Sequence, residues 1–179
     1  MALQINPPLT DADTRALRAG DEVVINGVIY TARDAAHKRL VGVLEKGEEL
    51  PLELEGQVIY YTGPTPPLPG RATGSAGPTT SSRMDVYTPS LLECGLKAVI
   101  GKGDRSDGVI DALNRHGAVY LAAVGGAGAL LAERISAAEI ILYPELGPEA
   151  IYRLEVVDFP AIVAIDSHAA DLYRSGSGR

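Results

Sequence analysis

Short apolar runs alternate with polar or amphipathic stretches along most of this chain. Runs rich in β-branched residues indicate strands, whereas apolar residues spaced three or four positions apart indicate helices. The predicted strands cover residues 57–61, 96–100, 118–124, 139–143, 152–157 and 161–165, with a last turn at Pro160, and residues 22–30 are predicted to form a hairpin around Asn26-Gly27. The predicted helices follow Thr10 and Thr31 as N-caps and cover residues 107–115 and 130–135, with a tight glycine-rich turn over residues 125–129. This alternation predicts a single α/β domain, in which helices flank both faces of a mixed, mostly parallel sheet.

The regular pattern breaks between residues 63 and 83. Residues 63–77 are too rich in glycine and proline for a helix or strand and too numerous for an ordinary connection, so they form either a functional loop or a structureless linker. The run Gly77-Pro78-Thr79-Thr80-Ser81-Ser82-Arg83 follows, and its hydroxyl residues favour the start of a helix. Free backbone N–H groups at a helix start, with Arg83 one turn further on, favour an anion. The alternative is a capped helix on the surface.

Composition and charge restrict the possible ligands. The chain has 179 residues, of which 46% are hydrophobic and 22% charged, and this is enough to build one apolar core. The net charge of −7 disfavours broad binding to nucleic acid or to an anionic membrane, so any anion must be held by a few local cations. Cys94 is the only cysteine and cannot by itself form an internal disulfide or a metal site. Because the sequence shows no signal peptide and no apolar run of membrane-spanning length, we expect a cytoplasmic protein.

Two basic residues occupy positions where a ligand is expected. Arg33 lies near the start of a predicted helix, where a positive charge opposes the helix dipole unless an anion lies beside it. His37 falls on the same face of that helix, one turn later. Lys102 stands between two glycines directly after a predicted strand, at the edge where α/β sheets bind ligands. The alternatives are solvated surface cations for Arg33 and Lys102, and a core histidine bonded to the backbone for His37.

Three motifs occur together in the order and spacing found in a known family. They are Tyr30-Thr31-Ala32-Arg33-Asp34-Ala35-Ala36-His37-Lys38-Arg39, the run from Gly77 to Asp85, and Ile100-Gly101-Lys102-Gly103. Further matches are Val124-Gly125-Gly126-Ala127, Glu145-Leu146-Gly147 with Glu149-Ala150-Ile151-Tyr152, and Val163-Ala164-Ile165-Asp166-Ser167. Over nearly its whole length the chain resembles the β subunit, equivalent to the C-terminal domain, of class I iron–sulfur fumarate hydratases and the related L(+)-tartrate dehydratases. The resemblance implies a swivelling β/β/α-type domain over residues 1–174, and we expect residues 175–179 to form a flexible tail.

The resemblance also implies a reaction, a cofactor and a partner. Enzymes of this family are hydro-lyases that reversibly add water to fumarate to give L-malate. Their 4Fe-4S cluster is bound by cysteines of a separate α subunit, so this chain would hold no metal itself. Its expected partners are that α subunit, in a dimer of αβ heterodimers, and a small dicarboxylate substrate, with no part for nucleic acid or membrane.

The resemblance assigns roles to individual residues. Thr79 is expected to handle the C3 proton of the substrate. The residues expected to bind the substrate carboxylates are Arg33, Arg83 and Lys102. Supporting roles are expected for Asp34 and His37, which would orient Arg33, and for Gly77 and Thr80. A threonine hydroxyl is normally too weak a base, so the helix start and the neighbouring cations would have to favour its alkoxide.

Two alternatives to a fumarate hydratase stay open. The first is an L(+)-tartrate dehydratase, although residues 149–152 resemble the fumarase branch more closely. The second is a non-catalytic module that binds a dicarboxylate or a partner protein, and such a module would tolerate Thr79→Ala. In either case we expect residues 63–77 to be ordered only when substrate and partner are present, because the loop has few contacts to offset its ordering entropy.

Overall fold

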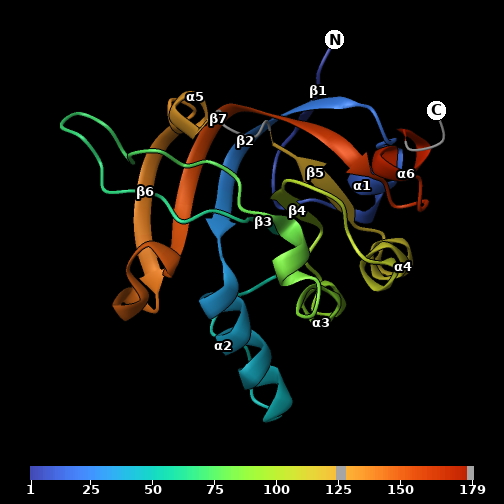
Figure 1. The fold of residues 1–179 in the computed structure, drawn as a ribbon, viewed down its shortest axis with the longest axis horizontal. Coiled ribbons are helices and arrows are strands. Elements are labelled where there is room, and N and C mark those ends of the chain that lie inside the picture. Colours follow the sequence, from blue (N-terminus) through green and yellow to red (C-terminus); the bar gives the residue numbers. More distant parts are fainter. Residues whose placement is uncertain (124–127, 177–179) are drawn as a thin grey trace.

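The computed structural model describes residues 1–123 and 128–176. Figure 1 shows its helices and strands in one layered body. In chain order, with η for a 3₁₀ helix, these are β1 (Leu3–Ile5), α1 (Asp11–Ala16), β2 (Glu22–Thr31), α2 (Asp34–Glu45), β3 (Val58–Tyr60), η1 (Ser81–Met84), α3 (Thr88–Glu93), β4 (Ala98–Gly101), α4 (Asp107–His116), β5 (Val119–Ala122), α5 (Gly128–Ala132), β6 (Ile135–Leu142), η2 (Pro144–Glu149), β7 (Ile151–Ile165) and α6 (Leu172–Gly176).

The sheet closes on itself. In the described part of the chain its strands follow the order β1-β2-β3-β4-β5-β7-β6, and β2 also pairs with β7. Strands β2, β3, β4, β5 and β7 therefore form a closed five-stranded barrel (Figure 1). Neighbours from β1 to β5 are parallel, whereas β7 is antiparallel to β2, β5 and β6. The predicted mixed α/β sheet is confirmed, but the prediction that helices flank both of its faces is wrong, because one face encloses the barrel interior.

Two apolar cores result from this closure. Along β3, Val58 and Tyr60 belong to an inner cluster, whereas Ile59 and Tyr61 belong to an outer one, as the twofold alternation of a strand requires. In the inner cluster the ring of Phe159 packs edge-on against Tyr60, with 5.2 Å between centroids. A strand that is buried on both faces has apolar residues at every position, which is why residues 58–61 form a continuous apolar run.

The outer cluster joins the barrel to three helices. Leu40 of α2, Leu91 of α3 and Leu113 of α4 are fully buried in it, against the outer face of the barrel (Figure 1). The start and end of α4 agree with its sequence: Ser106 caps the first turn, and Gly117 ends the helix in the left-handed conformation at φ 64°. These helices cover the sides of the strands and leave the strand ends available for a site.

The hairpin predicted around Asn26-Gly27 is wrong. Residues 22–31 form one continuous strand, with a register shift against β7 between Ile25 and Gly27 and a φ of 122° at Gly27. The Asn26 side chain donates to Asp158 Oδ1 at 3.2 Å, and the Asp158 N–H donates to Asn26 Oδ1 at 2.9 Å. Asn-Gly therefore forms a β-bulge in place of a turn, because β7 offers a partner along the whole strand.

The turn predicted at Pro160 is also wrong. Residues 151–165 form the single long strand β7, and Pro160 lies opposite Val24 of β2. The pairing with β6 ends at Val156 and the pairing with β5 begins at Ile162, so β2 is the paired neighbour at Pro160. A proline, which has no N–H to donate, is tolerated where a strand has one free side.

The two predicted threonine caps have opposite outcomes. Thr10 caps α1 as predicted, since its hydroxyl accepts the Asp13 N–H at 3.2 Å and the Asp13 side chain accepts the Thr10 N–H at 2.8 Å. Thr31 does not cap α2. It ends β2, its hydroxyl accepts the Tyr152 N–H at 3.1 Å, and Arg33 occupies the N-cap position without a side-chain cap bond. The β2 strand runs one residue further than predicted because Thr31 pairs with Tyr60 of β3.

The loop over residues 63–77 contains no helix or strand, and it is closed at its base by its own hydrogen bonds. The Thr65 N–H donates to Ser75 O at 3.0 Å, and the Gly74 N–H donates to Thr65 O at 2.9 Å. Further out, Arg71 approaches Glu133 beside α5 at 3.9 Å, and Leu68 at the tip is 70% exposed. The mobility predicted for this loop in the isolated chain stays a prediction.

Two sequence predictions fall partly outside the described residues. The glycine-rich turn predicted over residues 125–129 has only its last two residues in the described part. Of the expected tail, Ser175 and Gly176 belong to α6, and residues 177–179 lie outside the described ranges. None of the helices in the described ranges is long and apolar enough to cross a membrane.

Candidate functional site

The carboxyl ends of the parallel barrel strands meet at one end of the molecule. There β2 leads to Arg33, β3 to Thr62 and Gly63, and β4 to Lys102. Side chains from several strands converge at such an edge, which is where α/β folds place their ligands. The location that the sequence suggested for Lys102 is therefore retained, although the sheet is closed.

The hydroxyl run crosses this same end of the barrel. The Thr79 N–H donates to Tyr61 O at 2.7 Å, Thr80 pairs with Lys102 in a parallel bridge, and the Ser81 N–H donates to Lys102 O at 2.9 Å. Thr79 is half-buried, whereas Thr80 and Lys102 are exposed. The hydroxyl of Thr79 and the ammonium group of Lys102 form no hydrogen bond or ion pair with any other described residue, so both are available to a ligand.

Asp34 brings two of the predicted cations together. Arg83 Nε donates to Asp34 Oδ1 at 3.1 Å, and Arg83 Nη2 lies 3.0 Å from Asp34 Oδ2. Arg33 Nη2 lies 4.0 Å from the same Oδ2, and Arg33 Nε is buried without a hydrogen-bond partner. Asp34 was expected to orient Arg33, and in the structure it contacts Arg83 more closely. The carboxylate offsets the repulsion between the two guanidinium groups and leaves donors of Arg33 unused.

Both ends of the loop over residues 63–77 abut these residues. A Cβ on Gly63 would lie 3.2 Å from Arg33 Cδ and 3.0 Å from Pro148 O, so the loop leaves the barrel in close contact with the Arg33 side chain. At the other end the Thr62 hydroxyl donates to Gly77 O at 2.7 Å. This bond places Gly77, one of the predicted supporting residues, directly before the hydroxyl run.

His37 lies beneath the site and does not face it. The side chain is fully buried, with Nδ1 2.8 Å from Arg33 O and the ring edge-on to Tyr61 at 5.3 Å between centroids. Burial lowers the pKa of His37 from 6.5 to about 4, so the imidazole is neutral at pH 7 and its Nδ1–H donates to the Arg33 carbonyl. This is the arrangement of a core histidine bonded to the backbone, and it can support Arg33 only through the main chain.

Acid is expected to destabilise the fold through His37. As the pH falls, the unfolded chain binds a proton near pH 6.5 and the folded chain only near pH 4, so the free energy of unfolding decreases between these values. By pH 5 the loss relative to pH 7 should be about 2 kcal/mol. Urea unfolding at both pH values should show this loss of unfolding free energy for the native chain. The control His168→Gln, which changes an exposed histidine, should show the same loss, and His37→Gln should show a smaller loss. If the free energy of unfolding depended equally on pH in all three proteins, His37 would not be the cause of the loss.

The prediction that the hydroxyl run starts an α-helix is wrong. Ser81–Met84 forms a four-residue 3₁₀ helix, Thr80 at its N-cap makes no side-chain cap bond, and the α-helix begins only at Thr88. A single turn of 3₁₀ helix has a small dipole. Any anion bound here would therefore depend on the side-chain cations.

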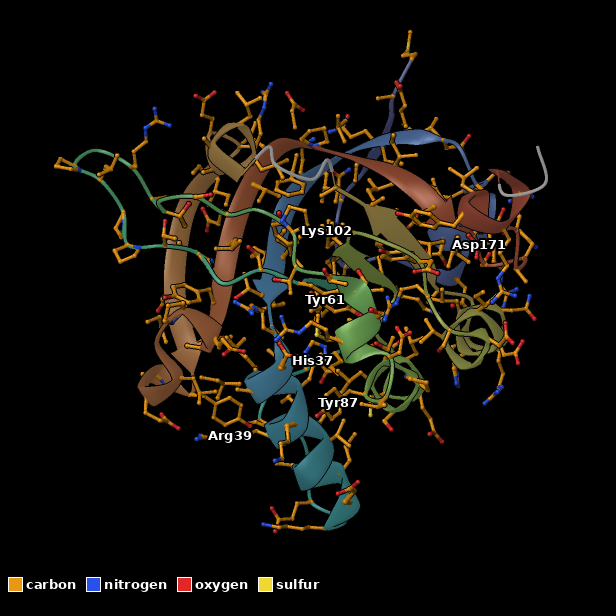
Figure 2. All side chains as sticks on the ribbon, in the orientation of Figure 1. His37, Arg39, Tyr61, Tyr87, Lys102 and Asp171 are labelled. Atoms are coloured by element: carbon orange, nitrogen blue, oxygen red, sulfur yellow. The ribbon has the colours of Figure 1, made fainter. Side chains whose placement is uncertain are left out.

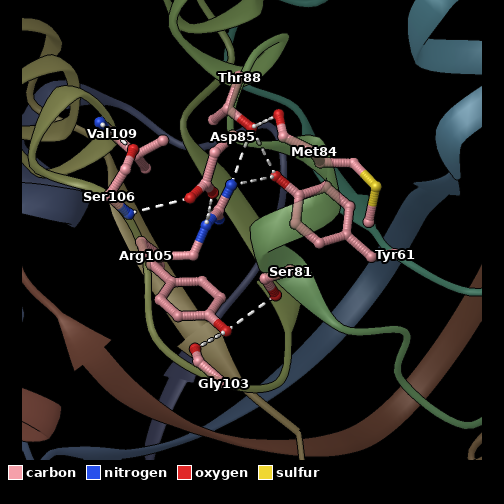
Figure 3. Close-up of polar contacts among 10 residues, drawn as sticks. Tyr61, Ser81, Met84, Asp85, Thr88, Gly103, Arg105, Ser106 and Val109 are labelled. Carbon is pink, nitrogen blue, oxygen red and sulfur yellow. Dashed lines mark hydrogen bonds and ion pairs between the residues drawn. The ribbon is translucent and has the colours of Figure 1, made fainter.

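The sequence reasoning missed a buried polar network centred on Arg105 (Figure 3). The Arg105 side chain is fully buried; its Nε donates to Asp85 Oδ1 at 2.6 Å, and its Nη2 donates to Thr88 Oγ1 at 2.9 Å and to the Tyr61 hydroxyl at 3.2 Å. The guanidinium carbon lies 5.2 Å from the centroid of the Tyr61 ring and 4.9 Å from that of Tyr120. No local signal separates Arg105 from a solvated turn residue, although a tyrosine within the apolar run of β5 indicated that a polar partner was nearby.

The described residues offer no metal site of their own. No group of three or more His, Cys, Asp or Glu side chains in residues 1–123 and 128–176 is arranged to hold a metal ion. Cys94, the only cysteine, follows α3, and burial raises the pKa of its thiol. This donor set does not fit a 4Fe-4S cluster, whose ligands are thiolates. Any cluster at this site would need ligands from outside these residues.

Comparison with known proteins identifies the family. Residues 1–176 match the family model described as fumarase C-terminus. The chain belongs to the fumarase C-terminus family. It is 43% identical over 152 residues to the aerobic class I fumarate hydratase of Escherichia coli strain K12, a match that covers 84% of this chain and 28% of that protein. It is 40% identical over 156 residues to fumarate hydratase 2 of Leishmania major, covering 86% of this chain and 28% of the relative.

A relative of similar length is also found. The chain is 41% identical over 171 residues to a Methanocaldococcus jannaschii protein that is named as an L(+)-tartrate dehydratase subunit beta, and the match covers 92% of this chain and 88% of that protein. The chain thus spans little more than a quarter of the length of the fumarate hydratases that it matches, and most of the beta subunit. Membership of the fumarase C-terminus family confirms the resemblance drawn from the three motifs.

Proposed function

We propose that this chain is the β subunit of a two-subunit hydro-lyase that reversibly hydrates fumarate to L-malate. The observation that carries the proposal is the placement of Arg33, Arg83, Lys102 and Thr79 at one end of the barrel. A dicarboxylate loses the hydration of both its charges when it binds, so it needs several fixed cations. The names of the relatives support this reaction class.

The two arginines and the lysine would bind the substrate carboxylates. Arg33 has a buried Nε without a partner, and its side chain is 27% exposed, so its guanidinium can still take up an acceptor. Arg83 is more exposed, at 52%, and would share its fork between Asp34 and a carboxylate. Lys102 would supply a point charge from the neighbouring strand end. Together these residues fix the substrate relative to Thr79.

Thr79 would move the proton at C3 of the substrate. Its hydroxyl would take this proton when malate is dehydrated and return it when fumarate is hydrated. The hydroxyl is not engaged by any other described side chain, and the cations around it would favour the alkoxide. Exclusion of water at a subunit interface would strengthen each of these interactions.

A partner α subunit would complete the site. When bound there, a 4Fe-4S cluster supplies a Lewis acid for the hydroxyl group of the substrate. We further propose that the complex is a cytoplasmic dimer of αβ heterodimers, in which the domain of residues 1–174 swivels against the α subunit and residues 175–179 form its tail. The relative that is named as a beta subunit supports a two-chain arrangement.

The loop over residues 63–77 is expected to become ordered in this complex. In the isolated chain its amide hydrogens should exchange with solvent rapidly, because its hydrogen bonds are few and Leu68 at its tip is exposed. Addition of the α subunit should slow the exchange by at least about tenfold, whereas residues 98–101 of β4 should be protected in both states. Equal protection of the loop with and without the α subunit would contradict this expectation.

Arg83→Lys should weaken substrate binding although it keeps the charge. A lysine cannot bridge Asp34 and a carboxylate with two parallel N–H donors, as the Arg83 fork can. Loss of one charge-assisted hydrogen bond costs about 1.5–3 kcal/mol, so KM should rise by about tenfold or more. The matched control is Arg153→Lys on β7, an exposed arginine paired with Glu155. Steady-state kinetics of the complex test this, and an unchanged KM would refute the role of Arg83.

The choice of substrate is the test of the proposed function. The chain and the α subunit should be co-expressed without oxygen, and product formation should be measured separately with L-malate and with L(+)-tartrate. Turnover of malate is expected. L(+)-tartrate dehydratase is the second candidate, since the relative of matching length carries that name, and turnover of tartrate alone would establish it. A cluster-loaded complex that turns over neither substrate would favour the non-catalytic binding module.

A further inference from the structure

Arg105 is a buried cation that cannot contact a substrate. Its side chain has no exposed surface, and it lies among Asp85, Thr88 and Tyr61 (Figure 3). Burial of a guanidinium is costly unless its charge and its donors are matched. The charge is matched by Asp85 and by the rings of Tyr61 and Tyr120. Asp85, Thr88 and Tyr61 accept from Nε and Nη2, whereas Nη1 is buried without a hydrogen-bond partner. Because burying this cation costs free energy, we expect Arg105 to do more than fill space in the core.

The network joins two segments that are distant in sequence. We call residues 79–88 the threonine loop and residues 101–106 the lysine loop. From the lysine loop, Arg105 reaches Asp85 and Thr88 of the threonine loop at 2.6 and 2.9 Å. The Ser106 N–H donates to the second oxygen of Asp85 at 2.9 Å. The Asp85 carboxylate is therefore held at both of its oxygens by the lysine loop.

The two flanking tyrosines tie both loops to the barrel. The Tyr120 hydroxyl is 2.8 Å from Ser81 Oγ and donates to Gly103 O at 2.7 Å, so it bonds one residue of each loop. The Tyr61 hydroxyl is 3.0 Å from Thr88 Oγ1, and Thr88 in turn donates to Met84 O at 2.9 Å. Because both rings lie close to the guanidinium, Arg105 helps to set their positions as well as the loop contacts.

We infer that Arg105 is a positioning residue, which fixes the threonine loop relative to the lysine loop. Arg83 lies between the anchored residues Ser81 and Asp85, and Lys102 lies directly before the anchored Gly103. The effect on turnover rests on the proposed function, in which these loops carry Thr79, Arg83 and Lys102. A displacement of about 1 Å in such groups can cost about a hundredfold in rate.

Arginine is required here because three kinds of contact converge on it. Its planar fork bonds Asp85, Thr88 and Tyr61 while its carbon lies near the rings of Tyr61 and Tyr120, and an ammonium group can do only part of this. The test variant is Arg105→Lys, which keeps the charge and loses the fork. Because an unpaired Asp85 could prevent folding, a second variant joins Arg105→Met to Asp85→Asn and removes both charges. The control is Arg115→Lys on the exposed face of α4.

Two readouts separate positioning from general stabilisation. Amide hydrogen exchange in the folded isolated chain should become at least about tenfold faster in the threonine and lysine loops, and stay unchanged at residues 58–60 and 98–100 of the barrel. In the complex with the α subunit, kcat should fall by about tenfold or more and KM for L-malate should rise. A merely structural role would reduce the amount of active enzyme and leave KM unchanged.

Each outcome decides a specific point. Unchanged exchange in both loops of Arg105→Lys and of the double variant would overturn the inference, and so would exchange that accelerates equally throughout the barrel. Faster exchange in the loops with unchanged kcat and KM would also overturn the inference, since the position of the loops would then have no effect on catalysis. If the loops loosen but the native complex turns over neither malate nor tartrate, the positioning of the loops stands and the proposed function fails.

Discussion

Thr79→Ala is expected to lower the turnover of L-malate by the complex about 10²- to 10⁴-fold, which is the usual contribution of a positioned proton-transfer group. The substitution removes a half-buried hydroxyl that bonds no other described residue, directly before Thr80, which pairs with Lys102. It leaves the carboxylate-binding cations in place, so KM should change little. Steady-state kinetics of the purified complex provide the measurement.

Two further variants make this prediction specific to Thr79. Ser82→Ala removes an exposed hydroxyl in the same segment, which bonds no other described side chain, and it should leave turnover unchanged. Thr79→Ser keeps a hydroxyl at the site and should recover a large part of the activity. If the Thr79→Ala complex turned over L-malate at a rate within a few-fold of that of the native complex, Thr79 would not be the proton-transfer group.

Gly101→Ala should be among the most damaging single-methyl changes in the chain. A Cβ at this position would lie 1.9 Å from Ser81 Oγ and 2.8 Å from Tyr61 Cδ2, at the place where β4 passes beneath the hydroxyl run. Ser81 could avoid it only by giving up its bond to Tyr120, and Tyr61 is fixed by Thr88 and Arg105. Overpacking of this kind costs about 1–3 kcal/mol in the free energy of unfolding.

The matched control is the same substitution at Gly42. This residue lies within α2, and no neighbouring atom comes within 4 Å of the position that its Cβ would take. Gly42→Ala should therefore raise the free energy of unfolding by about 0.4–1 kcal/mol, because alanine favours the helix and restricts the unfolded chain. Urea unfolding should thus show a lower free energy of unfolding for Gly101→Ala and a higher one for Gly42→Ala. A Gly101→Ala variant as stable as the native chain would contradict the packing described here.

The parts of the fold that the sequence predicts correctly depend on local contacts. The cap at Thr10 and the helix over residues 107–115 both follow from neighbouring residues. Closure of the barrel depends on the pairing of β2 with β7, more than a hundred residues apart, and no local pattern encodes it. The same pairing explains the two wrong turns at Asn26-Gly27 and Pro160, since a distant strand supplied the partner that would otherwise be missing.

The site shows a similar division. The motifs placed Arg33, Thr79, Arg83 and Lys102 in the chain, and the parallel strands and the ion pair of Asp34 explain why they meet. Arg105 gave no signal, because the stretch Asp104-Arg105-Ser106 has the composition of an exposed turn. Only the folded structure shows that two tyrosines and a carboxylate enclose this cation. In Figure 2, Tyr61 lies between Lys102 and His37, which separates the exposed cation from the buried histidine.

A titration of the α subunit with this chain tests directly whether the two proteins share one active site. A fixed amount of cluster-loaded α subunit should be mixed without oxygen with increasing amounts of the chain, and the rate of malate turnover recorded. We expect no turnover by either protein alone and a rate that saturates at one chain per α subunit. Full turnover by the α subunit alone, or none at any ratio of the two proteins, would contradict the claim that this chain supplies half of a shared active site.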